Sequence, residues 1–291
     1  MLHRECRLRL TALEMLGRSA GPQTFQWTDR DYLLYALALG LGSDLQYGPV
    51  LSFVYEQNLR VVPTFPTVLA WVAEPTFASL GAHPNFALHA GQSIELHRVL
   101  DRPVAVTVTG RVEAVHDKGR ERGALIVVRQ EIVRASDGAP IATLLTSCFA
   151  RDAGGCGSAG EPQAAPRTVP DRPPDHRIIY DVHNDAALLY RLTGDRNPLH
   201  ADPKAAQAAG FERPILHGLC SFGLISRAML ECIAEWRPER IISQSARFSA
   251  PVYPGDRLEV SLWREGREVC FEARVVERRV AVITGGRALL R

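Results

Sequence analysis

Hydrophobic residues in the second half of the chain recur first at spacings of three and four, and then at a spacing of two. From Gly218 to Trp236 they form one apolar stripe, which predicts a long amphipathic helix. A short alternating run, residues 177–182, precedes the helix. Three or four strand-like stretches separated by turn signals follow it, at residues 241–252, 257–263, 268–277 and 280–290. A helix followed by consecutive antiparallel strands predicts an α+β unit in which the sheet covers the helix.

The first half repeats this order in a weaker form. Residues 33–37 parallel residues 188–192, and Pro63-Thr-Phe-Pro66 opens a helical run to Ala73. Strand-like stretches follow at residues 92–98, 104–115, 123–133 and 141–149. Between the halves, residues 151–175 are rich in glycine and proline and lack periodicity, which is typical of a linker. The pattern therefore predicts an N-terminal domain, 1–150, and a C-terminal domain, 176–291.

Composition excludes several classes of protein. Hydrophobic residues make up 46% of the chain and charged residues 23%, and the net charge of +2 with no basic stripe argues against a nucleic-acid partner. The 6 cysteines show no Cys-x-x-Cys spacing, which disfavours a zinc ribbon or a disulfide framework. No apolar run approaches the roughly 18 residues of a membrane span, and neither end resembles a secretory or Ser-Lys-Leu peroxisomal signal. We therefore expect a cytoplasmic protein with no membrane partner.

The candidate chemistry lies in one stretch, Tyr190-Arg-Leu-Thr-Gly-Asp-Arg-Asn-Pro-Leu-His200. A helix-like run over residues 185–192 should end at Gly194, and Pro198 should push Asn197 out of the helical region. Asp195, Asn197 and His200 then share one bent loop, where a carboxylate and an imidazole suit proton transfer to and from water. The alternative is a helix C-cap followed by turn-forming Asp and Asn.

That stretch resembles the signature of the 2-enoyl-CoA hydratase 2 family, the (R)-specific branch of the MaoC-like dehydratases, which reads Gly-Asp-x-Asn-Pro-Leu-His. The similarity continues through residues 201–203, 210–223 and 246–255 and reaches back to about residue 28. It implies a double hot-dog fold, two antiparallel sheets each wrapped around a long helix. The N-terminal unit, which has Gly40-Leu-Gly-Ser-Asp-Leu-Gln46 in place of the signature, would be inactive and opened for a bulky acyl chain.

The resemblance implies a hydro-lyase of fatty-acid β-oxidation that converts trans-2-enoyl-CoA reversibly to (3R)-3-hydroxyacyl-CoA, with medium, long or branched acyl chains. Hydration needs a deprotonated water at C3, a proton at C2 and a stabilised thioester oxygen. The family assigns proton transfer to Asp195 and His200, and the oxygen to the backbone N–H of Gly218. Asn197 would orient the water or His200. Which of Asp195 and His200 is the base stays open.

Acyl-CoA contacts of the family map onto His89, Ala90, Lys118 and Phe248, and Arg196, Pro198 and Leu199 of the signature are further candidates. The chain departs from the usual His-Gly-Glu-Gln by reading His89-Ala-Gly-Gln92, although a backbone contact at Ala90 would survive. Lys118 could instead be a solvated turn residue, and Phe248 could belong to the core.

His217 is interpreted as structural, because no third ligand stands at zinc-like spacing and the family uses no metal. We expect no cofactor besides the CoA thioester substrate, and a homodimer as the assembly. Two other functions stay open. A hot-dog thioesterase would lack the Asp-x-Asn-Pro-x-His string, and the intact trio argues against a non-catalytic acyl-CoA-binding subunit.

Overall fold

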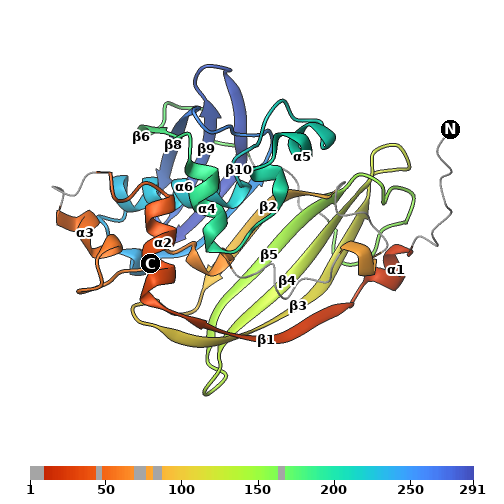
Figure 1. The fold of residues 1–291 in the computed structure, drawn as a ribbon, viewed down its shortest axis with the longest axis horizontal. Coiled ribbons are helices and arrows are strands. Elements are labelled where there is room, and N and C mark those ends of the chain that lie inside the picture. Colours follow the sequence, from red (N-terminus) through yellow and green to blue (C-terminus); the bar gives the residue numbers. More distant parts are fainter. Residues whose placement is uncertain (1–9, 44–47, 69–76, 81–86, 163–167) are drawn as a thin grey trace.

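The computed structural model describes residues 10–43, 48–68, 77–80, 87–162 and 168–291. Ten strands form one continuous antiparallel sheet in the order β1-β3-β4-β5-β2-β7-β10-β9-β8-β6 (Figure 1). The first five strands belong to the first half of the chain and the other five to the second half. The predicted α+β class is therefore confirmed.

Strand bounds agree with the alternating pattern to within a few residues. In the first half they are β1 Ser19–Trp27, β2 Ala87–Leu96, β3 Val104–Asp117, β4 Ala124–Arg134 and β5 Pro140–Ala150. In the second half they are β6 His176–Asp181, β7 Ile241–Phe248, β8 Arg257–Glu265, β9 Glu268–Val275 and β10 Val280–Leu290. Strand β7 ends before the predicted Val252, and β1 was not predicted.

The two halves are joined through their sheets. Strand β2 pairs with β5 of its own half and also with β7 of the other half, from Gly91 opposite Arg247 to Glu95 opposite Ser243. Each half would otherwise expose a strand edge with unpaired backbone groups, which invites further pairing. One sheet therefore carries the hydrophobic core of both halves.

The long predicted helix is α6, Gly218–Cys232, and most of its side chains are buried. It ends four residues before Trp236, because Glu235 and Trp236 have φ of 53° and 58°, which a helix cannot continue. Helix α2, Asp29–Ala38, begins with a capping box between Thr28 and Asp31. Arg227 of α6 donates a 2.8 Å hydrogen bond to the carbonyl of Leu39, and this bond ties α6 to the end of α2.

The remaining helices are short: α1 Ala12–Met15, α3 Gly48–Val54, α4 Ala186–Tyr190 and α5 Pro203–Ala208. Residues 65–68 form one 3₁₀ turn of the helical run expected to reach Ala73, and the rest of that run lies outside the described residues. Residues 44–46, which stand where the second half has its signature, also lie outside them. No helix in the described ranges is long and apolar enough to cross a membrane.

The predicted linker is fastened to the first half along its first part. The carboxylate of Asp117 accepts hydrogen bonds from the N–H groups of Gly155 and Gly157, at 2.9 Å each. Ala159 pairs with Val115 at the end of β3 as an isolated bridge. Residues 163–167 lie outside the described part of the linker. This glycine-rich segment is therefore hydrogen-bonded to the end of β3. The domain boundaries themselves stay a prediction.

Candidate active site

The loop that carries the acidic and basic residues begins where a helix ends. Helix α4 is followed by a 3₁₀ turn, Arg191–Thr193, and then by Gly194 with φ of 143°. A residue with a side chain is strained at this φ, whereas glycine adopts it freely. The predicted end of the helix at Gly194 is confirmed, and the turn directs Asp195 away from the helix axis.

Backbone hydrogen bonds hold the loop in shape. The Asn197 N–H donates to Asp195 Oδ1 and the Leu199 N–H donates to Asn197 Oδ1, each at 3.0 Å. Asn197 has φ of −52° and ψ of 125°, outside the helical region as Pro198 requires. Its side-chain oxygen is used by this turn. That Asn197 orients a water or His200 stays a prediction. Its amide nitrogen is the side-chain atom that would do so.

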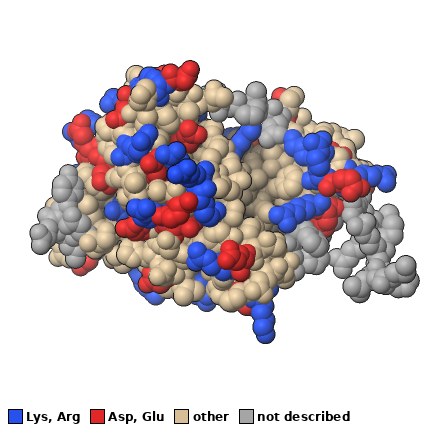
Figure 2. All heavy atoms as spheres, turned by 90° about the horizontal axis from the view of Figure 1, so that it is seen from above, with Lys and Arg blue, Asp and Glu red and all other residues tan. Residues whose placement is uncertain are grey.

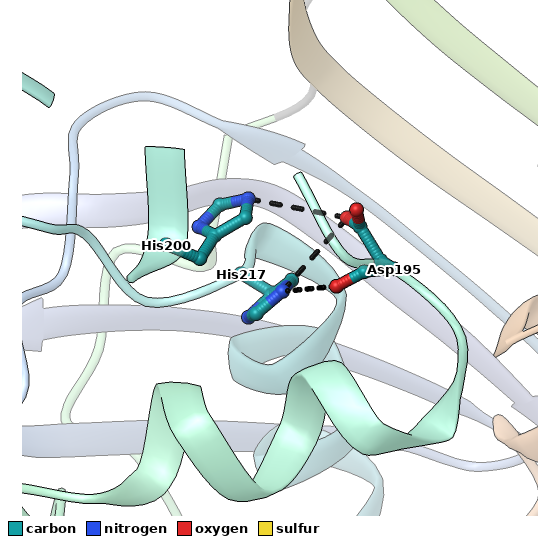
Figure 3. A group of neighbouring side chains, drawn as sticks. All are labelled: Asp195, His200 and His217. Carbon is teal, nitrogen blue, oxygen red and sulfur yellow. Dashed lines mark hydrogen bonds and ion pairs between the residues drawn. The ribbon is translucent and has the colours of Figure 1, made fainter. Parts of the chain in front are cut away.

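His200 is buried and points one nitrogen toward Asp195 (Figure 3). Its Nδ1 lies 2.8 Å from the carbonyl oxygen of Ile215 and must donate, so in the neutral ring Nε2 carries the lone pair. Burial lowers the pKa of His200, and the charge of Asp195 opposes this shift without reversing it. Nε2 lies 3.9 Å from Asp195 Oδ2, too far for a direct hydrogen bond and short enough for both atoms to contact one water.

His217 lies beside Asp195 and His200 (Figure 3). The sequence analysis, which interpreted His217 as structural, did not predict this position. Its ring stacks on that of His200, with centroids 3.7 Å apart and planes 24° apart. Its Nε2 lies 3.1 Å from the backbone oxygen of Asp195 and 3.9 Å from Oδ2. Burial, and next the neighbouring His200, lower the pKa of His217 to about 2. His217 is therefore neutral at physiological pH.

No third ligand stands at zinc-like spacing in the sequence, but the fold brings a third candidate beside Asp195 and His200. Asp195, His200 and His217 each offer a ligand atom within 4.8 Å of the others. However, a zinc ligand must present a lone pair to the ion, and the His217 nitrogen nearest the carboxylate is the one that donates to the Asp195 carbonyl. The three residues therefore suit an ion poorly as they stand. That no metal or other cofactor is needed stays a prediction.

A cavity of about 590 Å³ opens beside these residues, and both halves of the chain line it. This volume is within the usual range for pockets that bind small molecules. Figure 2, which views the molecule from above relative to Figure 1, shows a hollow between two lobes with basic side chains on both sides of it. The cavity lining includes Leu88, His89, Ala90, Phe149, Arg151, Asp195, Asn197, Leu199, His200, His217, Gly218, Ser221 and Phe248.

Gly218 and Phe248 form one wall of the cavity. Gly218 is the first residue of α6, where backbone N–H groups have no partner within the helix. A Cβ at this position would lie 3.0 Å from the ring of Phe248, so a side chain would crowd that wall. Phe248 in turn meets His89 edge to face across the β2–β7 junction, with ring centroids 4.9 Å apart. Phe248 is thus both packed and in contact with the cavity.

Three predicted substrate contacts are not part of the described cavity lining. Arg196 and Pro198 are exposed on the loop and do not belong to the described cavity lining. Lys118 is in the turn between β3 and β4 and is absent from it as well. That turn is at the same end of the sheet as the start of β2, because Ala124 and Ala87 both pair with Ala150. Lys118 therefore lies outside the described cavity lining, and its contact with a ligand stays a prediction.

Two of the polar lining residues that sequence reasoning missed are Arg151 and Ser221. Arg151 is an exposed cation that lines the cavity just after β5, where the sequence pattern already indicates a linker. Ser221 lies one turn into α6 and is buried against the cavity. Arg151 belongs to no motif, and Ser221 lies in the similar stretch 210–223 without a role assigned to it, so only the fold places both at the cavity.

Comparisons with known proteins find relatives of both halves of the chain. Residues 25–152 match the MFE-2 hydratase 2 N-terminal domain, and residues 165–286 match the MaoC like domain. The chain is 41% identical over 253 residues to 3-hydroxyacyl-thioester dehydratase Y of Mycobacterium tuberculosis, covering 86% of each protein. It is 32% identical over 282 residues to the peroxisomal enoyl-CoA hydratase 2 of Arabidopsis thaliana, covering 91% of each.

A solved structure extends the comparison to the fold. The MaoC-like dehydratase from Phytophthora capsici superposes with a TM-score of 0.84 at 30% identity, over 97% of this chain and 98% of that one. The fold and these relatives define a double hot-dog hydro-lyase, and the predicted double hot-dog fold is confirmed. The chain belongs to the enoyl-CoA hydratase 2 family of MaoC-like dehydratases.

Proposed function

We propose that this protein hydrates trans-2-enoyl-CoA reversibly to (3R)-3-hydroxyacyl-CoA, and that Asp195 and His200 act together on one water. The observation that carries the proposal is the 3.9 Å separation of Asp195 Oδ2 and His200 Nε2 at the wall of the shared cavity. With the His200 ring neutral, both atoms can accept a hydrogen bond, so one water can donate one hydrogen bond to each. Such a water presents its oxygen lone pairs to a substrate.

The two groups can move protons in a closed cycle. One of them takes a proton from the water as its oxygen bonds to C3, and the electron pair of the double bond shifts toward C2 and the thioester carbonyl. The pair then delivers a proton to C2, so that the water supplies both the hydroxyl and the hydrogen. Asp195 and His200 finish in their starting states, which is why no other reactant is needed.

Charge that builds on the thioester oxygen needs a donor placed in advance. The N–H of Gly218 is suited to this, because it lies at the start of the 15-residue helix α6 and borders the cavity. The positive end of the helix dipole favours the developing negative charge at the same point. Lack of a side chain at Gly218 lets the substrate approach the backbone beside Phe248.

The first half of the chain is proposed to bind the rest of the ligand. Leu88 and Phe149 give the cavity an apolar wall, which suits a medium, long or branched acyl chain. His89, the backbone of Ala90, Arg151 and Lys118 face or flank the region where CoA would extend. Arg151 and Lys118 can pair with phosphate groups. We also expect the chains to form homodimers, and this remains a prediction.

The product is expected to have the (3R) configuration, as the resemblance to the (R)-specific branch implies, and the hydroxyl and hydrogen should add to the same face. Asp195 and His200 meet one water from one side of the cavity, so the substrate plane should receive both groups from that side. Hydration of crotonyl-CoA in D₂O, with chiral analysis of the product and NMR assignment of the C2 deuterium, measures both. A (3S) product would contradict the proposal, and release of free CoA instead of hydration would identify a thioesterase.

Substitution of His89 or Lys118 is expected to raise KM several-fold and to change kcat little. These residues belong to the half without the acid/base pair, and loss of a contact equal in ground and transition states raises KM alone. Steady-state kinetics of His89→Gln and Lys118→Ala on decenoyl-CoA measure this. Lys204→Ala is a matched control, because Lys204 is the other lysine of the chain and is exposed on α5. A collapse of kcat in either test variant would contradict the division of roles.

A further inference from the structure

His217 occupies the centre of the site and has no role in the chemistry described above. It precedes Gly218 as the residue that caps α6, and only 2% of its surface is exposed. One face of its ring stacks on His200 at 3.7 Å, and the ring of Tyr190 lies 4.9 Å away, tilted by 44°. The ring is therefore packed against two aromatic neighbours, and its orientation is constrained.

The hydrogen bond of His217 fixes its tautomer. Its Nε2 lies 3.1 Å from the backbone oxygen of Asp195, and a carbonyl oxygen can only accept. Nε2 therefore carries the hydrogen. The other nitrogen, Nδ1, is buried and makes no hydrogen bond with any described residue. This single donor group links residues 22 positions apart in the chain.

These contacts act on both members of the acid/base pair. The hydrogen bond restrains the backbone of Asp195, whose carboxylate is otherwise only partly enclosed, with 19% of the side chain exposed. The stacked ring restrains the plane of His200, whose Nδ1 is anchored on Ile215. Rotation of either side chain would change the distance between Oδ2 and Nε2, which is 3.9 Å when both are held.

We propose that His217 is a positioning residue of the hydration site: its Nε2–H fixes Asp195 and its ring fixes His200, so that the two reacting atoms stay one water apart. The inference rests on the proposed function and adds a third residue to it. Because His217 adjoins Gly218, the same residue also sets the acid/base pair relative to the proposed oxyanion donor. Acid, base and oxyanion donor are thereby held as one unit.

Glutamine and asparagine test the role of the single donor atom. The side-chain nitrogen of His217→Gln is separated from Cβ by the same number of bonds as Nε2 of histidine, so it can donate to the Asp195 carbonyl. The nitrogen of His217→Asn corresponds to Nδ1 and cannot reach that carbonyl. His217→Leu keeps bulk and removes all donors. Thermal unfolding of each variant shows which ones fold, and the Gln–Asn comparison is sufficient if the Leu variant does not.

In crotonyl-CoA hydration, kcat of the Asn and Leu variants is expected to fall by about 100-fold, the usual effect of misplacing a reacting group by ~1 Å. KM should change less than threefold, and the Gln variant should retain kcat within about tenfold of wild type. Equal loss in folded Gln and Asn variants would overturn the proposal, as would wild-type kcat in the Asn variant.

A second readout does not depend on activity. Nitrogen-15 NMR of the histidine rings should show His217 of the wild type protonated at Nε2 and His200 protonated at Nδ1. The His200 signals should shift in the Gln, Asn and Leu variants alike, because each variant lacks the ring that stacks on His200. If the wild-type protein fails to hydrate enoyl-CoA, the proposed function is wrong, while these spectra still decide whether His217 positions His200. Unchanged His200 signals in every variant would overturn the inference.

Discussion

Asp195→Asn and His200→Gln are each expected to lower kcat by about 1,000-fold, within the range that positioned acid/base groups contribute. Asp195→Asn keeps the shape of the side chain and His200→Gln keeps its length, and each removes one of the two proposed proton-transfer groups. Combining them should cost little more than either alone, because both groups serve one proton cycle. Hydration of crotonyl-CoA by the two single variants and the double variant measures the effect.

The matched control for this experiment is Asp202→Asn. Asp202 follows the same signature, but its carboxylate caps helix α5 by accepting the N–H of Lys204 at 2.8 Å. Asparagine caps a helix as well as aspartate does, so this variant should keep wild-type kcat. A single variant at Asp195 or His200 that hydrates at near wild-type rate would show that the proton-transfer pair is assigned wrongly.

Acidification from pH 6.5 to about 4 is expected to reduce the free energy of unfolding steeply. Burial lowers the pKa of His89 to about 4 and that of His217 to about 2, and it lowers the pKa of His200 as well. Unfolded histidine binds its proton near pH ~6.5, so below that pH the unfolded state holds more protons. Each such histidine then removes about 1.4 kcal/mol per pH unit until its folded-state pKa is reached.

Urea unfolding between pH 7 and 4.5 measures this dependence. The combined loss over that range is comparable with the roughly 5–15 kcal/mol that stabilises a typical domain. His89→Gln should make the dependence shallower, because glutamine fills similar space and does not titrate. A free energy of unfolding that stays constant from pH 7 to 4.5 would contradict the burial of these rings.

The pattern of hydrophobic positions predicted most of the fold because most elements bury one face. Strand β10 matches its predicted bounds, 280–290, and α6 starts where expected at Gly218. Strand β1 escaped prediction for a physical reason. Its residues Ser19–Trp27 include Gly21 and Pro22 and are mostly exposed, so it shows no alternation and forms only by pairing with β3.

The site was predictable only where it is local. Asp195 and His200 lie five residues apart on one loop, so the sequence alone brings them together. The contact of His217 with both depends on how α6 begins beside that loop, and no spacing signals it. Arg151 joins the cavity from the other half of the chain, which the pattern of either half cannot reveal.

The junction of β2 with β7 makes the pairing of two hot-dog units an intramolecular event. When two separate chains pair, their association weakens on dilution, but units joined by a chain keep a fixed and high effective concentration. The complete site should then form in each chain at any protein concentration. Two units within one chain also need not have the same sequence. Substitutions in the cavity wall contributed by β2 and β5 leave the loop of Asp195 unchanged, so the substrate range can change without disturbing the proton-transfer pair.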